Sequence, residues 1–338
     1  MNTNSKELKD NFGRIHNYLR ISLTDKCNLN CIYCNPARSA IKSIPRNDIL
    51  SFDEILRLIN IFVNKFGINK LRFTGGEPFA RKGIMDFFAQ IAPQIKEHEI
   101  YTGITTNGTL LNDKLSLLHE YQIHNLNISL DSLSPDTFKR MTGSSDFNNI
   151  TSAIDEALTL GFDNLKINVV VIRGINDNEL VDFVRFAADK NINVRFIEFM
   201  PFTDNQWNES SFISYKEMME RISAGFKLEI IDEDNNSVSK DYKISGYGGK
   251  VSFITSVSEH FCGTCNRLRI TANGHMKLCL FSTADDGLDL KNLLRFDQVS
   301  DDDIAIAIEL KISLKKYQHP DIAELIQLSH HNMIGIGG

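Results

Sequence analysis

The chain has 338 residues with a formal net charge of −6 and a pI near 5.9, and this acidic balance argues against a general nucleic-acid binder. Its 42% hydrophobic and 24% charged residues are typical of a soluble globular protein. No apolar run reaches the roughly 18 residues of a membrane span, and residues 1–13, expected to be a loose leader, contain no signal-peptide core.

From residue 18 onward, short β-rich runs alternate with helical patterns, which is typical of a parallel α/β fold. The expected strands are 18–23, 69–73, 100–105, 125–130, 165–172 and 193–199. The clearest helix begins after Ser51, which forms a capping box with Glu54, and ends at Gly67. Ser134 followed by proline marks a second helix start. Weaker helical patterns cover 83–92, 112–120, 148–160 and 178–189.

Six such units predict an incomplete (β/α)6 barrel of the TIM type over residues 14–230, with its working face at the carboxyl ends of the strands. The alternation stops after Met200. A helix is expected at 216–224 and an acidic connector at 231–241. The remainder, 231–338, is predicted to be an α+β region with strands at 250–256 and 267–281, the second turning at Asn273-Gly274, and a helix at 300–316.

Three cysteines, Cys27, Cys31 and Cys34, follow the first expected strand with the spacing C-x3-C-x2-C. This spacing lets three thiolates of one loop converge on a single metal centre, whereas structural zinc and ferredoxin clusters usually take four protein ligands. Three ligands suit a [4Fe–4S] cluster whose fourth iron stays open for a small molecule. A zinc site missing a histidine, or three unrelated buried thiols, would show the same residues.

A second triplet, Cys262, Cys265 and Cys279, has the spacing C-x2-C-x13-C. Without an export signal, such clustered thiols indicate metal ligation in a reducing cytoplasm rather than disulfides. The interpretations are a second [4Fe–4S] cluster or a truncated zinc ribbon completed by a distant histidine. In an extended strand, Arg267 and Arg269 share a face with Cys265 and would form an anion site, although arginines on a solvated face give the same pattern.

The segment 74–78, Thr-Gly-Gly-Glu-Pro, follows the second expected strand. Paired glycines allow a ligand close to the backbone, and a tight strand-to-helix turn has the same sequence. Beside the first cysteine triplet, the Gly-Gly-Glu-Pro element resembles the radical S-adenosylmethionine (SAM) superfamily, in which the open iron binds SAM. The resemblance implies SAM contacts at Tyr33, Gly76, Ser129 and Met200.

The two triplets, the Gly-Gly-Glu-Pro element and the Arg-Phe-Ile-Glu-Phe-Met stretch that ends at 200 together resemble the GTP 3′,8-cyclase family of molybdenum cofactor biosynthesis. This resemblance covers roughly residues 14–281 and the Gly337–Gly338 end. It implies two [4Fe–4S] clusters, with the guanine of GTP on the second. It also implies that polar and basic side chains hold or lie near the triphosphate and ribose, namely Arg20, Arg72, Thr105, Lys166, Arg195, Arg267 and Arg269. Lys26 and Asn35 depart from the residues common in the family, but neither change removes a ligand.

In the reaction that the resemblance implies, one-electron reduction cleaves SAM to methionine and a 5′-deoxyadenosyl radical. This radical removes the ribose 3′-hydrogen of GTP, and the resulting carbon radical attacks C8 of guanine. Reduction by one electron and protonation then give the cyclic dihydro product. The implied partners are GTP, a flavodoxin- or ferredoxin-type reductant, the next enzyme of the molybdopterin pathway and a second copy of the chain in a homodimer.

Three other functions fit parts of the pattern. A peptide-modifying radical SAM enzyme with an auxiliary-cluster domain usually carries more C-terminal cysteines than the three present here. A non-catalytic iron–sulfur electron carrier would have fully ligated clusters and would need no barrel. A zinc-stabilised binding module would contain zinc and neither iron nor sulfide.

Overall fold

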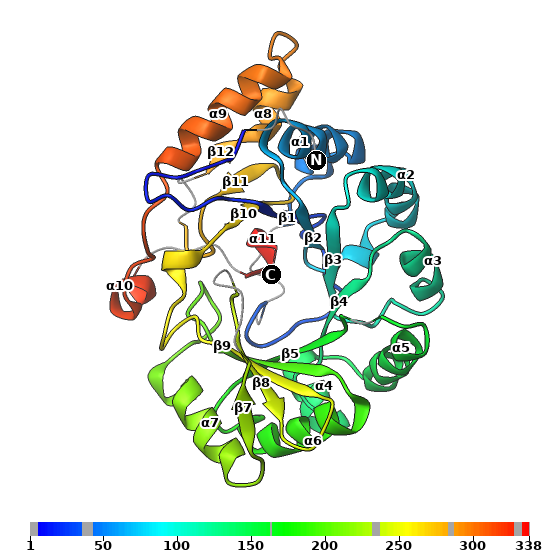
Figure 1. Ribbon diagram of the computed structural model, residues 1–338, viewed down its shortest axis with the longest axis vertical. Helices are drawn as coiled ribbons and strands as arrows, with labels where there is room; N and C mark the ends of the chain where they lie inside the picture. The colour runs from blue at the N-terminus through cyan, green and yellow to red at the C-terminus, as the bar shows by residue number, and fades with distance from the viewer. Residues whose placement is uncertain are drawn as a thin grey trace.

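A computed structural model describes residues 6–35, 43–162, 164–231, 237–282, 287–327 and 333–337. In this part of the chain twelve strands form one curved sheet, in the order β12-β11-β10-β1-β2-β3-β4-β5-β6-β9-β8-β7. Helices surround its outer face, and the C-terminal end of the chain lies on the inner side (Figure 1).

The six predicted strands are confirmed at the centre of this sheet, where neighbouring strands are all parallel. They are β1 (Tyr18–Ser22), β2 (Lys70–Thr74), β3 (Tyr101–Thr106), β4 (Asn125–Ser129), β5 (Lys166–Val171) and β6 (Asn193–Glu198). The helices that connect them are α1 (Phe52–Phe66), α2 (Ile84–Glu97), α3 (Leu115–Glu120), α4 (Pro135–Thr142), α5 (Phe147–Thr159) and α6 (Leu180–Lys190). These elements confirm the α/β fold with a mostly parallel sheet.

Local signals set the ends of the first helix as expected. Ser51 accepts a hydrogen bond from Glu54 N, the Glu54 carboxylate accepts one from Ser51 N, and Gly67 closes the helix with φ +64°. The end predicted for α2 at residue 92 is wrong, because the helix continues to Glu97 through Pro93. Pro93 is exposed, while Ile91 and Ile95 are buried and continue the apolar face beyond it.

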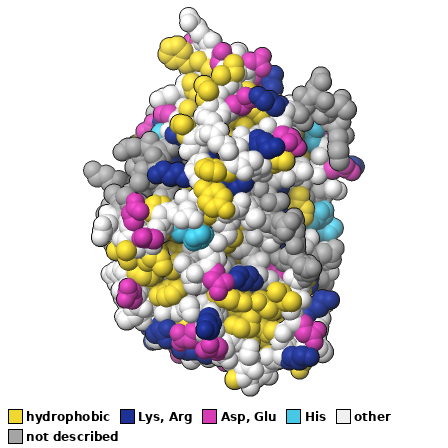
Figure 2. Space-filling view, turned by 60° about the vertical axis from the view of Figure 1, so that its left-hand side comes forward, with side chains coloured by type: hydrophobic (Ala, Val, Ile, Leu, Met, Phe, Trp, Pro, Cys, Tyr) yellow, Lys and Arg dark blue, Asp and Glu magenta, His cyan; other side chains and the backbone are white. Residues whose placement is uncertain are grey.

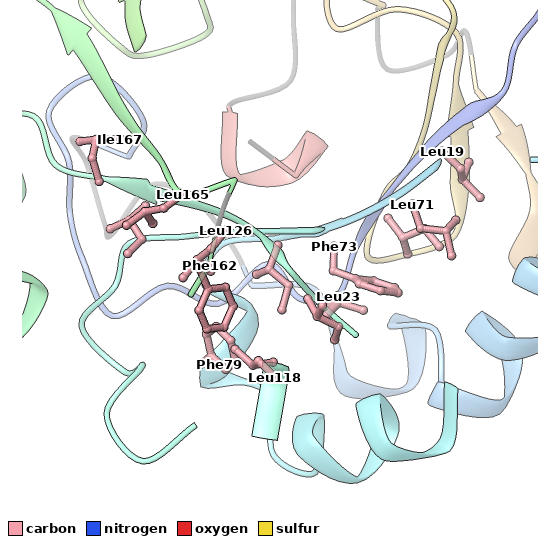
Figure 3. Close-up of a cluster of buried hydrophobic side chains, with 14 of the residues drawn as sticks. Leu19, Leu23, Leu71, Phe73, Phe79, Leu118, Leu126, Phe162, Leu165 and Ile167 are labelled. Carbon is pink, nitrogen blue, oxygen red and sulfur yellow. The ribbon is translucent and has the colours of Figure 1, made fainter. Parts of the chain in front are cut away.

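The hydrophobic core fills the space between the outer face of the sheet and the helices. Figure 3 shows Leu71, Phe73 and Leu126 of the strands in one apolar layer with Leu118 of α3. The ring of Phe73 meets that of Phe87 edge to face at a centroid distance of 5.5 Å. Because apolar residues occupy the outer face, the alternate residues of each strand point to the inner side.

The chain after β6 extends the sheet at both of its edges. At one edge β9 (Lys250–Ile254) pairs parallel to β6, followed by β8 (Lys240–Ile244) and β7 (Leu228–Ile230). At the other, β10 (Arg267–Ile270) pairs parallel to β1, followed by β11 (His275–Lys277) and β12 (Leu288–Asp289). The predicted turn at Asn273-Gly274 joins β10 to β11.

The remaining helices of the described residues lie mostly in the last third of the chain. They are α7 (Tyr215–Ser223), α8 (Leu290–Arg295), α9 (Asp301–Ser313), α10 (Ile322–Gln327) and α11 (Met333–Ile336). Short 3-10 turns occur at Arg46–Asp48, Pro78–Ala80, Asp177–Glu179, Glu209–Ser211 and Cys262–Thr264.

Two expectations about irregular segments are wrong. Residues 240 and 241, predicted to lie in a connector, begin β8, because they pair with Phe253 and Ser252 of β9. Residues 6–13 are not a loose leader, because Leu8 and Asp10 are buried and Lys9 bridges to Ile15. The sequence boundary at 230/231 stays a prediction.

Candidate active site

The inner face of the parallel strands carries a row of guanidinium groups. Arg20 of β1 stands opposite Arg72 of β2 on one side and Arg269 of β10 on the other. Two residues earlier in β1, Tyr18 stands opposite Arg267 of β10 and Lys70 of β2. Directly opposed like charges repel one another. Binding of an anion against this row would therefore be favourable.

The inner face encloses a cavity of about 760 Å³. All the predicted site residues line it, brought together from strands and loops that are far apart in the sequence. They are Arg20, Cys27, Cys31, Tyr33, Cys34, Arg72, Gly76, Thr105, Ser129, Lys166, Arg195, Met200, Cys262, Cys265, Arg267, Arg269 and Cys279. The structure brings these residues together around one cavity, and their roles stay predictions.

The first cysteine loop is held against the turn after β2. Gly76 N donates to the Thr24 carbonyl oxygen at 2.7 Å, and Glu77 N donates to that of Lys26 at 2.8 Å. A Cβ on Gly76 would lie 2.4 Å from the Lys26 carbonyl oxygen. Glycine is therefore required at 76 for the loop that carries Cys27 to approach this turn.

Tyr33 connects the first cysteine loop to the segment that follows β4. Its hydroxyl donates to Asp131, just after β4, at 2.8 Å, and the same carboxylate accepts from Val170 N at 2.9 Å. Burial raises the pKa of Asp131 to about 6. Burial also raises the pKa of Cys34 to about 12, with Cys27 and Asp131 adding to the shift. The Cys34 thiol is therefore held in its neutral form unless a cation binds to it.

The second cysteine triplet lies in a cationic environment instead. Arg267 Nη2 donates to Cys265 Sγ at 3.4 Å, and Lys315 Nζ donates to the same sulfur at 3.8 Å. Although burial raises the pKa of Cys265, Arg267 and Lys315 lower it to about 6. This thiol is therefore poised to be a thiolate, the form that ligates metals.

The buried cations of the cavity lower one another's pKa values. Burial lowers the pKa of Arg20 and of Arg195 to about 10 and that of Lys166 to about 8, with further contributions from neighbouring arginines. Burial also lowers the pKa of Arg269 strongly, and Arg20 and Arg267 add to the effect. A polyanion in this space would relieve their mutual repulsion.

Some buried polar atoms in the cavity wall have no hydrogen-bond partner among the described residues. They include Arg269 Nη1 and Thr105 Oγ1. Such groups are costly when they stay unpaired. A ligand that offers several acceptor oxygens, as a triphosphate does, would satisfy both.

In the part of the chain that the structure describes, no three His, Cys, Asp or Glu side chains form a group that could hold a metal ion. The chemistry of the donor set nevertheless fits two thiolate-ligated clusters. Each triplet lines the cavity, and neighbouring thiols of the same triplet add to the raised pKa values of Cys31, Cys34, Cys262 and Cys279.

The C-terminal end of the chain reaches the same space. Met200 packs in a buried apolar group with Phe202 and Ile336 of α11. A Cβ on Gly337 would lie 2.7 Å from Ser22 Cβ and 2.8 Å from Thr74 Oγ1, at the ends of β1 and β2. The chain therefore approaches the ends of β1 and β2 as far as Gly337, and Gly338 lies outside the described residues.

Sequence reasoning missed several polar residues of the cavity. Tyr18 accepts a hydrogen bond from Arg72 Nε at 2.7 Å, and although burial raises its pKa, Arg72 and Arg20 lower it to about 7. Asn168 Oδ1 accepts from Arg195 Nε at 2.9 Å. Tyr18 lies two residues from Arg20 in β1, and Asn168 lies two residues from Lys166 in β5. Because alternate residues of a strand share a face, the predicted sites could have identified both.

Comparison with known protein families assigns the barrel to the radical SAM class, because the Radical SAM superfamily model matches residues 21–187. A second family model, Molybdenum Cofactor Synthesis C, matches residues 192–320.

The chain is 41% identical over 336 residues to the GTP 3′,8-cyclase of Geobacter sulfurreducens. The alignment covers 98% of this chain and 100% of the relative. The chain is also 41% identical to the mitochondrial GTP 3′,8-cyclase of Arabidopsis thaliana, covering 99% of this chain and 84% of the relative. The chain therefore belongs to the GTP 3′,8-cyclase family. It spans 52% of the molybdenum cofactor biosynthesis protein 1 of Dictyostelium discoideum, at 43% identity over 98% of this chain.

Among solved structures, Streptococcus suis SuiB bound to S-adenosylmethionine is similar, with a TM-score of 0.60 and 14% identity. The likeness covers 85% of this chain and 65% of that chain, and at this identity it concerns the fold alone. No helix of the described residues has the length and apolarity needed to cross a membrane.

Proposed function

We propose that this chain is a radical SAM GTP 3′,8-cyclase, a lyase that converts GTP to (8S)-3′,8-cyclo-7,8-dihydroguanosine 5′-triphosphate, an early step of molybdenum cofactor biosynthesis. The observation that carries the proposal is one cavity of about 760 Å³ that has both cysteine triplets and the row of basic side chains in its wall. The names of the two cyclase relatives that match along nearly the whole chain support the same reaction.

The radical SAM family uses a [4Fe–4S] cluster and SAM. We place this cluster on Cys27, Cys31 and Cys34, with SAM against Tyr33, Gly76, Ser129 and Met200. The cluster and SAM together supply the 5′-deoxyadenosyl radical. The chain's own part is to hold the loop through the Gly76 turn and to orient Tyr33 through Asp131. Cys262, Cys265 and Cys279 would hold a second [4Fe–4S] cluster.

The basic side chains of the inner face would bind the triphosphate and ribose of GTP. Arg72 is fixed by Tyr18, and Arg195 is fixed by Asn168, so both guanidiniums are oriented before the substrate arrives. Arg269 Nη1 and Thr105 Oγ1 gain partners when an oxygen-rich anion binds. These side chains would position the ribose and guanine of GTP in a cavity that restricts the entry of water.

The test is anaerobic reconstitution with iron and sulfide, followed by incubation with SAM, dithionite and GTP and product analysis by mass spectrometry. We expect about eight irons per chain, 5′-deoxyadenosine and a cyclic product isomeric with GTP. Iron and 5′-deoxyadenosine with GTP unchanged would contradict the substrate and favour a peptide-modifying enzyme. Iron without SAM cleavage would favour an electron carrier, and zinc without iron would favour a binding module.

A single substitution tests the substrate side separately. Arg269→Ala should weaken GTP binding about 10- to 100-fold, because a charge-assisted hydrogen bond contributes about 1.5–3 kcal/mol. SAM cleavage without GTP should persist. Arg140→Ala is the matched control, because Arg140 is exposed on α4 and does not line the cavity. Unchanged GTP turnover in Arg269→Ala would refute its assignment.

We further propose a cytoplasmic location, a flavodoxin- or ferredoxin-type reductant, transfer of the product to the next enzyme of the molybdopterin pathway, and a homodimer. The proposals for the reductant and the next enzyme rest on family membership. The homodimer is supported by exposed apolar side chains on α9.

A further inference from the structure

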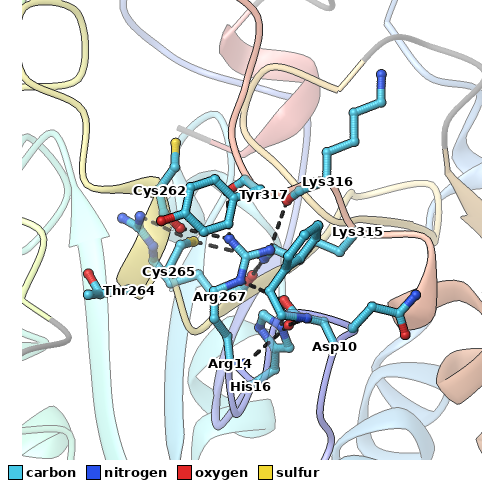
Figure 4. A network of polar contacts seen from close by, with 12 residues as sticks. Asp10, Arg14, His16, Cys262, Thr264, Cys265, Arg267, Lys315, Lys316 and Tyr317 are labelled. Atoms are coloured by element: carbon cyan, nitrogen blue, oxygen red, sulfur yellow. Dashed lines mark hydrogen bonds and ion pairs between the residues drawn. The ribbon is translucent and has the colours of Figure 1, made fainter.

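Lys315 is a buried cation beside the second cysteine triplet. It follows α9, is 5% exposed, and does not line the cavity. Its Nζ donates to Cys265 Sγ at 3.8 Å and to the Arg267 carbonyl oxygen at 2.9 Å (Figure 4). It can therefore act on a ligand in the cavity through the thiol and the strand that it contacts and through its charge.

The buried ammonium of Lys315 needs negative charge nearby, because some of its neighbours are also cations. Arg14 and Arg267 are cationic neighbours, whereas the thiols of Cys265 and Cys279 are the neighbours that favour its charged form. Burying an ammonium costs several kcal/mol unless an anion or hydrogen bonds compensate. One carbonyl oxygen compensates only in part. A thiolate-ligated cluster on this triplet would supply the missing negative charge.

A buried polar network fixes the segment that carries Lys315. Arg14 Nη1 donates to the carbonyl oxygens of Cys262 at 2.7 Å and of Tyr317 at 2.8 Å. Arg14 is itself held by Asp10, with 2.6 Å between Nε and Oδ2. One guanidinium thus joins the cysteine loop to the segment after α9, so the ammonium and the thiol keep a fixed separation.

We propose that Lys315 is a positioning residue of the second iron–sulfur cluster: it holds the Cys265 thiolate through a hydrogen bond and offsets its negative charge, which makes the cluster easier to reduce. The inference rests on the proposed function, because it requires a cluster on the second triplet. Hydrogen bonds to cluster sulfurs and nearby charges set reduction potentials. Loss of a cation disfavours the added electron, so loss of Lys315 lowers the potential.

The test isolates the second cluster. A background variant with Cys27, Cys31 and Cys34 all replaced by alanine keeps only the second triplet, so bound iron and EPR signal report that cluster alone. Lys315→Met, Lys315→Gln and Lys315→Arg are compared in this background. Lys316→Met is the matched control, because Lys316 is the adjacent, exposed lysine. The readout is the midpoint potential from an EPR-monitored redox titration, together with iron content.

The iron content tests the second cluster, and the midpoint potential tests the role of Lys315. A background variant without iron refutes the second cluster and this inference with it. With about four irons bound, a shift to more negative potential in Lys315→Met and Lys315→Gln, with Lys315→Arg and Lys316→Met unchanged, supports the inference. Unchanged potentials in Lys315→Met and Lys315→Gln refute it and leave the proposed function standing. If Lys315→Met does not fold, the comparison of Lys315→Gln with Lys315→Arg decides, because both keep a donor and only one keeps the charge.

Discussion

Lys166 of β5 is a cavity cation whose charge can be lost within about one pH unit of neutrality. Burial lowers its pKa to about 8, and Arg195 adds to the shift. Its ammonium is therefore present below pH 8 and lost as the pH rises through that value. A bound triphosphate favours the ammonium, so nucleotide binding and protonation of Lys166 stabilise each other.

We predict that GTP affinity falls by up to about tenfold as the pH rises from 7 to 9, because the charged fraction of a group with a pKa of about 8 falls by about that factor over this range. Lys166→Arg should bind GTP with less dependence on pH in this range, since a guanidinium stays charged. Isothermal titration calorimetry of both proteins across this range checks the prediction. Any titration of GTP itself is common to both proteins, so parallel pH profiles would contradict it.

At the residue scale, the sequence predicted the reactive and charged residues of the site better than the residues that hold them in place by hydrogen bonds. The thiols, Arg267 and Arg269 stand in motifs with fixed spacing, so their types and positions could be interpreted directly. Tyr18 and Asn168 stand in no motif, and their contacts with Arg72 and Arg195 arise only when strands pair. Asp131 was missed for the same reason, because its partner Tyr33 lies 98 residues earlier.

At the element scale, the turn after β2 determines where the first cysteine loop can lie. Gly76 contacts the backbone of Lys26 so closely that a Cβ would require the loop to move. Cys27 is the next residue, so any such movement displaces a proposed cluster ligand.

We predict that Gly76→Ala lowers stability by about 1–3 kcal/mol, the usual cost of overpacking. It should also lower the iron retained by the first triplet while the second triplet keeps its iron. Gly225→Ala is the matched control, because a Cβ there meets nothing nearer than 3.8 Å. Thermal unfolding and iron analysis after reconstitution measure both effects. Full iron content in Gly76→Ala would show that the loop tolerates the displacement.

The elements most difficult to predict were the short strands at the sheet edges. β7 spans only Leu228–Ile230, and β8 begins in a polar stretch, so neither shows a period-2 pattern. β8 is a strand because it pairs with β9, and β7 is a strand because it pairs with β8. By contrast, α1 and β1–β6 carry their own caps or apolar runs, and their predicted positions are correct to within about two residues.

At the scale of the whole molecule, α9 exposes an apolar face opposite its buried one. Ile306, Leu310 and Leu314 recur every four residues, and the two leucines are 66% and 67% exposed. Figure 2 shows hydrophobic side chains gathered at the upper end of the molecule, with charged side chains beside them. Two antiparallel copies related by a two-fold axis would place these apolar side chains of one α9 against those of the other.

We predict that the protein is a homodimer through α9 and that Leu310→Asp makes it a monomer by burying a charge in the contact. Light scattering should give about twice 38.3 kDa for the unmodified chain and about 38.3 kDa for the variant. Leu117→Asp is the control, because Leu117 is an exposed leucine on α3. A monomer at all concentrations without the substitution would contradict the proposed contact.

The sequence by itself determined what depends on neighbours along the chain: the alternation of β and α elements, the ends of α1, the two thiol spacings and the inward face of each strand. Periodicity and capping are local, so they can be interpreted from one sequence. Tertiary structure alone decided that β9 and β10 extend the two edges of the same parallel sheet and that Arg14 contacts Tyr317, 303 residues away. Such contacts depend on which segments pack together, and no local pattern in this sequence specifies that choice.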